Sequence, residues 1–229
     1  MELKAKTATF SRRFLLLFLI FLLLSVILES WSLGGEKITS KTQRLEGTQR
    51  IYLTVDLCPS SKKYEKKLFD ALEKLGHEQE KPIPVAVAVS GNWIIYHQKE
   101  LAALKNSYLD ITWVNHSLTH PFKNDFLNNP KVNFSHEVKG NIELMEKNGL
   151  KPSKYFRFPG LRHNEKRLKA LKAMGYTNLD ADAWLGKGQK IKNNSIVLIH
   201  GNGNEMAGIV EKFIKNLKTI EFDSLDLNR

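Results

Sequence analysis

A β-type run leads directly into two histidines in the segment Ile111-Thr112-Trp113-Val114-Asn115-His116-Ser117-Leu118-Thr119-His120. Imidazole is a common ligand of zinc and of other divalent metals. Residues four apart lie on one face of a helical turn, so the spacing predicts that His116 and His120 converge on one metal ion from such a turn. Paired histidines also occur on ordinary polar surfaces, but the motifs elsewhere in the chain favour a metal site.

Polar residues follow other β-type runs in the same way. Asp56 comes directly after Ile51–Val55, and His200 comes directly after Ser195–Ile199. In a β/α barrel the carboxyl ends of the strands share one rim, where active sites are built. We therefore expect the polar residues at the predicted strand ends to form one site. These residues are Asp56, His116, Arg157, Asp180 and His200.

Helical and strand patterns alternate along the chain, which predicts an α/β fold with mainly parallel strands. We expect a distorted β/α barrel of about six to seven parallel strands. Only fifteen residues separate Trp184 from His200, too few for a further helix and strand, so the barrel should be abridged or open. Strands are predicted at 51–55, 84–89, 110–114, 155–158, 177–179, 195–199 and 220–222, and helices from Ser60 or Ser61 to 75 and at 97–106, 135–148, 164–174 and 206–217.

The first 33 residues have the pattern of an export signal. Arg12 and Arg13 precede the largely apolar stretch Phe14–Leu28. A basic start followed by an apolar core is typical of such signals. Extended to Leu33, the stretch approaches the length of a membrane span, which favours an uncleaved signal anchor preceding the domain as a hydrophobic helix. Cleavage after Ser30-Trp31-Ser32 is the alternative.

A polar linker is expected at residues 34–49, followed by one domain at 50–229. Cys58 is the only cysteine, so the chain forms no internal disulfide. An exported protein without disulfides is typical of a bacterial envelope. We expect the chain to be anchored in the inner membrane facing the periplasm, or to be periplasmic or secreted after signal cleavage.

The net charge of +11 at pH 7 also bears on the partners. The lysines are spread over predicted helices such as 62–74 and 166–172, which is typical of solvated helix faces. We therefore predict no nucleic-acid partner. The expected partners are an anionic envelope surface and, through the N-terminal segment, the membrane.

Five short motifs follow one another along the chain: Thr54-Val55-Asp56, His116-Ser117-Leu118-Thr119-His120, Arg157-Phe158-Pro159-Gly160, Asp182-Ala183-Trp184 and Leu198-Ile199-His200. Their order resembles that in the polysaccharide deacetylases of carbohydrate esterase family 4. Those enzymes carry Thr-Phe-Asp-Asp-Gly-Pro, His-Ser/Thr-x-x-His, Arg-x-Pro-Tyr or Arg-x-Pro-Gly, Asp-Trp and Leu-x-His. The resemblance extends from about Ile51 to the C-terminus.

The resemblance implies a metal-dependent hydrolase that removes N-acetyl or O-acetyl groups from an envelope polysaccharide, such as peptidoglycan or another N-acetylhexosamine polymer. It assigns His116 and His120 as ligands of a divalent metal, which we expect to be zinc. Asp56 is then the general base, Arg157 orients it, and His200 is the general acid.

One departure from the family affects the metal site. Leu57 stands where the family has a second aspartate that binds the metal. The third ligand is then either Asp56, which would no longer be free as a base, or Cys58, which lies on the same side of an extended segment as Asp56. A small buried apolar side chain is the alternative interpretation of Cys58. Leu57→Asp would restore the triad in a family-type pocket, and would otherwise bury an unpaired carboxylate.

A second departure affects the acid histidine. Ala183 precedes Trp184, so the carboxylate that the family uses to hold His200 is missing. Asp180 or Asp182 is expected to replace it. Substrate contacts are predicted for Trp184, Pro159 and Asp182.

Two functions remain open at this point. Retention of Asp56, Arg157 and His200 favours an active enzyme, since a binding protein does not need a base and an acid together. Leu57 favours the alternative, a catalytically impaired relative that binds glycan without turnover.

Overall fold

The computed structural model describes residues 48–60, 62–121 and 125–225. The signal segment predicted at 1–33 and nearly all of the linker predicted at 34–49 lie outside these residues. Within the described ranges, no helix is long and apolar enough to cross a membrane.

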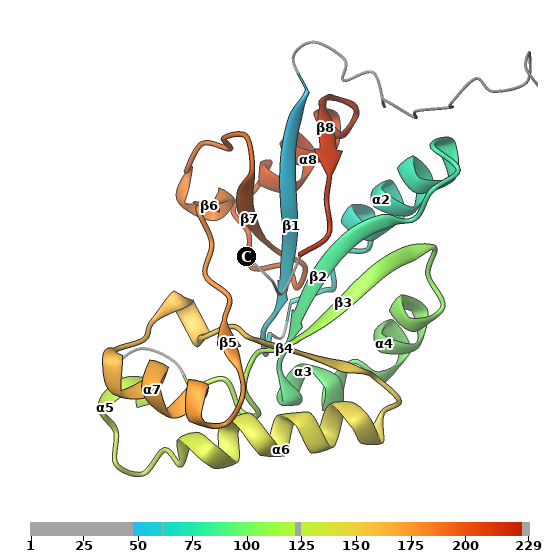
Figure 1. Cartoon of the computed structure of the whole chain (residues 1–229). Coiled ribbons are helices and arrows are strands. Elements are labelled where there is room, and N and C mark those ends of the chain that lie inside the picture. Colours follow the sequence, from blue (N-terminus) through green and yellow to red (C-terminus); the bar gives the residue numbers. More distant parts are fainter. Residues whose placement is uncertain (1–47, 61, 122–124, 226–229) are drawn as a thin grey trace, which may run out of the picture. The chain divides into compact units, whose positions relative to one another are not determined.

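The strands form one sheet in which every pairing is parallel, with the order β5-β4-β3-β2-β1-β7-β6 and with β8 pairing β1 off this path. β5 and β6 are the two ends of the path, so the sheet is open, as the sequence predicted (Figure 1). The strands are β1 (Gln49–Leu57), β2 (Ile83–Val89), β3 (Leu109–Asn115), β4 (Pro152–Phe156), β5 (Thr177–Asn178), β6 (Ala183–Trp184), β7 (Ser195–His200) and β8 (Ile220–Phe222).

The side chains of β1 and β2 alternate between two faces of the sheet, one of which packs into the main apolar core. Residues 51, 53, 55 and 57 of β1 and 83, 85, 87 and 89 of β2 pack into the main apolar core with helix α2 (Lys66–Glu78). The alternate residues of β2, Ala86 and Ala88, face a second, smaller cluster. Because side chains on a strand point alternately to its two faces, Asp56 lies on the face opposite Leu57.

Two predicted helices begin or end differently from the prediction. α2 starts at Lys66 and not at Ser60 or Ser61, because the Ser60 hydroxyl accepts the backbone N–H of Lys62 and donates to Asn204. The last helix, predicted at 206–217, is shortened to α8 (Ile209–Lys215), followed by a 3₁₀ turn. Two helices were not predicted, α3 (Gly91–Tyr96) and α5 (Asp125–Asn128), and the remaining helices are α4 (Gln98–Lys105), α6 (Phe134–Lys147) and α7 (Glu165–Ala173).

The prediction that the two histidines stand on a helical turn is wrong. The chain after β3 is an irregular loop in which Ser117 and His120 both have left-handed backbone angles, with φ of 65° and 56°. The loop is held by hydrogen bonds from Ser117 N–H to the Asn115 side chain (2.9 Å) and from Leu118 N–H to the Glu137 carbonyl (2.9 Å). The histidines therefore converge through loop geometry and not through helical periodicity.

A buried amide network fixes this loop to its surroundings. The Asn115 side chain donates to the Val138 carbonyl (2.8 Å) and accepts from Asn141 (2.7 Å), which also donates to the Val89 carbonyl (3.0 Å). These bonds connect β2, β3 and α6 directly beneath the histidine loop. Removing the hydrogen-bond partner of a buried polar group lowers the free energy of unfolding by about 1–3 kcal/mol.

Asn115→Ala should therefore lower the free energy of unfolding by about 2–5 kcal/mol, because it leaves the Ser117 N–H and the Val138 carbonyl without their partners. Urea unfolding followed by circular dichroism measures this change. Asn106→Ala is the matched control, since it removes one exposed side-chain hydrogen bond, to the Ala102 carbonyl, and should cost under about 0.5 kcal/mol. Equal losses in the two variants would contradict a structural role for the buried network.

Candidate active site

Residues from five segments of the sheet rim, at or after the ends of β1, β3, β4, β6 and β7, line one cavity of about 430 Å³. It lies at the carboxyl ends of the strands, as the rim argument predicted. Of the strand-end residues, Asp56, His116 and His200 reach its wall, and His120 joins them from the loop after β3. The full lining is Asp56, Cys58, Pro59, His116, Thr119, His120, Gly160, Leu161, Trp184, Leu198, His200 and Asn204.

Arg157 supports Asp56 from behind the cavity wall. It is fully buried directly after β4; its Nη1 donates to Asp56 Oδ1 (3.1 Å) and its Nη2 to Thr54 Oγ1 (3.0 Å). Burial by itself raises the pKa of Asp56, but the Arg157 guanidinium and then His116 outweigh it and lower the pKa below the ordinary value. Asp56 is thus held ionised, with Oδ1 engaged and Oδ2 directed toward His116 at 3.7 Å.

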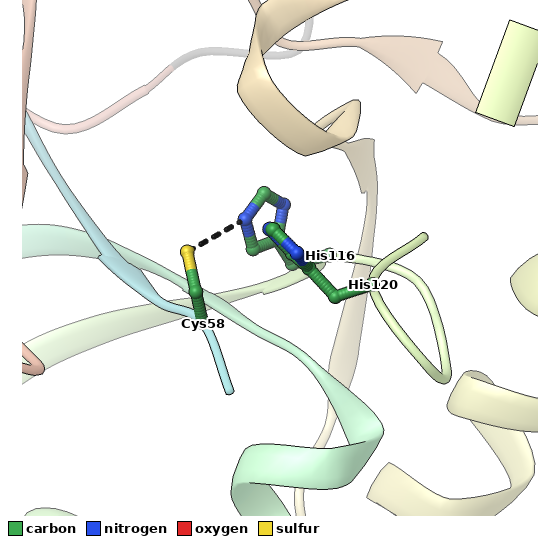
Figure 2. Close-up of side chains that lie close together, drawn as sticks. All are labelled: Cys58, His116 and His120. Atoms are coloured by element: carbon green, nitrogen blue, oxygen red, sulfur yellow. Dashed lines mark hydrogen bonds between the residues drawn. The ribbon is translucent and has the colours of Figure 1, made fainter. Parts of the chain in front are cut away.

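The two ring nitrogens of His116 have different roles: Nδ1 is hydrogen-bonded to the backbone, and Nε2 faces the Cys58 thiol. Its Nδ1 lies 2.9 Å from the Arg157 carbonyl, which can only accept, so Nδ1 carries the proton. Nε2 then has a lone pair, and it lies 3.4 Å from Cys58 Sγ. Figure 2 shows the Cys58 side chain directed at the His116 ring, with His120 beside that ring.

His120 completes a compact group of metal-ligating atoms. One ligand atom each from Cys58, His116 and His120 lies within 4.8 Å of the other two. The His120 Nε2 atom is buried and has no hydrogen-bond partner among the described residues. Burial and the neighbouring His116 lower the pKa of His120 to about 3, so its imidazole is neutral. A neutral imidazole with an unpaired buried nitrogen has the chemistry of a metal ligand, so these residues fit a divalent metal.

Glu205 holds His200, and the sequence did not lead us to predict this contact. Its Oε1 accepts both the Nδ1–H (2.9 Å) and the backbone N–H (2.7 Å) of His200. Burial by itself lowers the pKa of His200, but the Glu205 hydrogen bond and the Asp56 charge outweigh it and raise the pKa above that of an ordinary histidine. A carboxylate five residues after Leu-x-His, beyond the Gly/Asn turn, was the available signal.

The expectation that Asp180 or Asp182 holds His200 is wrong. Asp180 pairs with His163 Nε2 (2.9 Å), and Asp182 accepts the backbone N–H of Ile196 (2.8 Å). Asp180 is therefore engaged by a side chain and Asp182 by a backbone N–H, and His200 is bound by Glu205 instead.

Only one of the three residues predicted to contact the substrate lines the cavity. Trp184 lies in the cavity wall, with its ring centroid 5.5 Å from that of His200. Pro159 is buried, and the wall is formed instead by Gly160 and Leu161 after it. Asp182 and Pro159 are absent from the cavity lining among the described residues.

Glu205→Gln should lower the pKa of His200, because the amide keeps an acceptor oxygen for Nδ1–H but removes the negative charge that stabilises the imidazolium. NMR titration of the His200 ring measures the pKa directly. Glu211→Gln, on the exposed side of α8, is the matched control and should leave it unchanged. A His200 pKa that is the same in all three proteins would show that Glu205 only shapes the turn.

Leu57→Asp should destabilise the domain by about 3–5 kcal/mol without gain of metal, because Leu57 is fully buried in the main apolar core on the face opposite Asp56. Thermal unfolding and zinc content of the full-length chain measure both effects. Leu57→Met is the control for altered packing and should cost under about 1.5 kcal/mol. Tighter zinc binding by Leu57→Asp would show instead that the strand end rearranges to present residue 57 to the cavity.

Several proteins of known structure share this fold. The chain is similar in structure to a family 4 carbohydrate esterase from Bacillus anthracis, with 29% identity, a TM-score of 0.61 and coverage of 78% of this chain and 81% of that one. It shares its fold with PdaA, a family 4 carbohydrate esterase of Bacillus subtilis, at 22% identity, TM-score 0.59 and coverage of 77% and 79%. A family 4 pseudoenzyme from Bacillus anthracis also shares the fold, at 11% identity, TM-score 0.53 and coverage of 76% and 64%.

The sequence itself gives the family. Residues 44–179, more than half of the chain, match the family model described as polysaccharide deacetylase. This range contains the Asp56, histidine-pair and Arg157 motifs, and the structure adds His200 to the same cavity from beyond it. The chain belongs to the polysaccharide deacetylase family.

Proposed function

We propose that this protein is a metal-dependent deacetylase that removes N-acetyl, or O-acetyl, groups from an envelope polysaccharide such as peptidoglycan or another N-acetylhexosamine polymer. The observation that carries the proposal is the pairing of Asp56 with His200. They are register partners on the neighbouring parallel strands β1 and β7, and both line the cavity. A base and an acid thus face one space beside the histidine pair.

The roles of these residues follow from their surroundings. Asp56, kept ionised by Arg157, accepts the proton of the attacking water. His200, whose pKa is raised by its hydrogen bond to Glu205, donates a proton to the leaving nitrogen. Hydrolysis of an amide needs both transfers, which explains why opposite pKa shifts are useful at two neighbouring residues of one cavity.

A divalent metal, which we propose to be zinc, would be held by His116 and His120 and would polarise the acetyl carbonyl and the water. The chain's own part is to keep both imidazoles neutral and oriented. The Arg157 carbonyl sets the tautomer of His116, and the Ser117 hydroxyl accepts the backbone N–H of His120 (3.1 Å).

Trp184 is proposed as the wall against which a sugar ring packs. Its indole lines the cavity next to His200, and aromatic faces pack well on the apolar face of a hexose. The basic and apolar pattern of residues 1–33 supports placing this activity in the bacterial envelope.

Glycan binding without turnover is the second candidate. The observation that favours it is Leu57, which replaces the family's metal-binding aspartate and faces the core. The two candidates make opposite predictions about acetate release from a bound glycan.

We expect the zinc-loaded full-length chain to release acetate from N-acetylglucosamine oligomers, and Asp56→Asn to lower kcat by about 10²–10⁴-fold with little change in glycan affinity. Acetate release and isothermal titration calorimetry measure the two quantities. Asp110→Asn, on the exposed amino end of β3, is the matched control and should be fully active. Glycan binding with no acetate release by the zinc-loaded wild type would establish the non-catalytic alternative.

A further inference from the structure

We infer that Cys58 takes the place of the missing aspartate and completes a Cys/His/His site with His116 and His120 that binds zinc through a thiolate. Asp56 is then free to act as the base. The inference rests on the proposed function for the presence of a metal, but it concerns which atoms hold that metal.

The distances fit a tetrahedral site. A zinc ion with a Zn–S bond of about 2.3 Å and a Zn–N bond of about 2.0–2.1 Å holds its sulfur and nitrogen about 3.5 Å apart. Cys58 Sγ and His116 Nε2 are 3.4 Å apart, and all three ligand atoms lie within 4.8 Å of one another (Figure 2). Three protein ligands with one open position is the arrangement of catalytic zinc sites.

Two ring nitrogens with lone pairs belong to this group. Among the described residues His120 Nε2 is buried with no hydrogen-bond partner, and His116 Nε2, which lies 3.4 Å from Cys58 Sγ, carries its lone pair because Nδ1–H donates to the Arg157 carbonyl. Asp56 does not complete the group: one of its oxygens accepts from Arg157 at 3.1 Å, while the other lies farther from His116 (3.7 Å) than the thiol does. Cys58 is therefore the better placed third ligand.

Strand geometry explains why residue 58 and not residue 57 reaches the metal position. β1 extends through Leu57, so residue 57 faces the apolar core and residues 56 and 58 both line the cavity. The Cys58 backbone is fixed by the Asn202 side chain, which donates to the Cys58 carbonyl (2.7 Å). The cysteine is thus placed by the loop after β7.

A thiolate also sets the metal preference. Sulfur ligands favour zinc and cobalt over magnesium and manganese, which prefer oxygen ligands. The site should therefore bind Zn²⁺ and Co²⁺ and not Mg²⁺ or Mn²⁺.

The test uses the full-length chain, stripped of metal and reloaded with Zn²⁺ or Co²⁺. We expect one zinc per chain by elemental analysis and a thiolate-to-cobalt charge-transfer band in the near ultraviolet, which identifies Cys58 without ambiguity because the chain has one cysteine. Cys58→Ser should abolish the band and weaken zinc binding by more than the 10–100-fold, roughly, that follows loss of an outer-sphere partner. Cys58→Asp should keep zinc and lose the band.

Asp110→Asn, at the exposed amino end of β3, is the matched control and should keep both zinc and the cobalt band. Circular dichroism confirms that each variant is folded. Unchanged zinc affinity in folded Cys58→Ser, or absence of the band in cobalt-loaded wild type, would each overturn the inference.

The outcomes separate this inference from the proposed function. Zinc and the cobalt band without acetate release would leave the thiolate site standing and remove the deacetylase. Acetate release by a wild-type chain whose cobalt form lacks the band would support the deacetylase and overturn the thiolate site.

Discussion

The buried ion pair between Arg157 and Asp56 is the interaction on which the rest of the site depends. Both side chains are almost completely removed from water, so either charge alone would be strongly destabilising. The pair ties the end of β1 to the residue after β4, while the Arg157 carbonyl fixes the His116 ring. Arg157 thus sets the charge of Asp56 and the orientation of His116.

The histidine loop shows how the fold supplies a geometry that regular structure does not. Left-handed angles at Ser117 and His120 are uncommon for residues with a side chain and are kept only where the surroundings compensate. Here the compensation is the buried Asn115 network beneath the loop and Glu137, which accepts from both the backbone and the hydroxyl of Thr119. Stability of the core and placement of the site are therefore coupled.

Beside each departure from the family pattern lies another side chain of suitable chemistry. Ala183 leaves no carboxylate before Trp184, and Glu205 reaches His200 from the loop after β7. Leu57 offers no ligand, and the thiol of Cys58 stands next to His116. Neighbouring residues of a strand face opposite sides of the sheet. Residue 58 therefore faces the cavity, whereas residue 57 faces the apolar core.

The sequence by itself determined the parallel α/β fold, the open barrel and the strand ends that carry Asp56, His116, Arg157 and His200, because these follow from local periodicity and from the shared rim of parallel strands. It placed the histidines on a helical turn and sought the carboxylate for His200 near Trp184. Only the tertiary structure decided these points. A loop held by long-range hydrogen bonds has no periodicity, and the return of Glu205 to His200 depends on the conformation of the irregular turn between them, which no helix or strand period encodes.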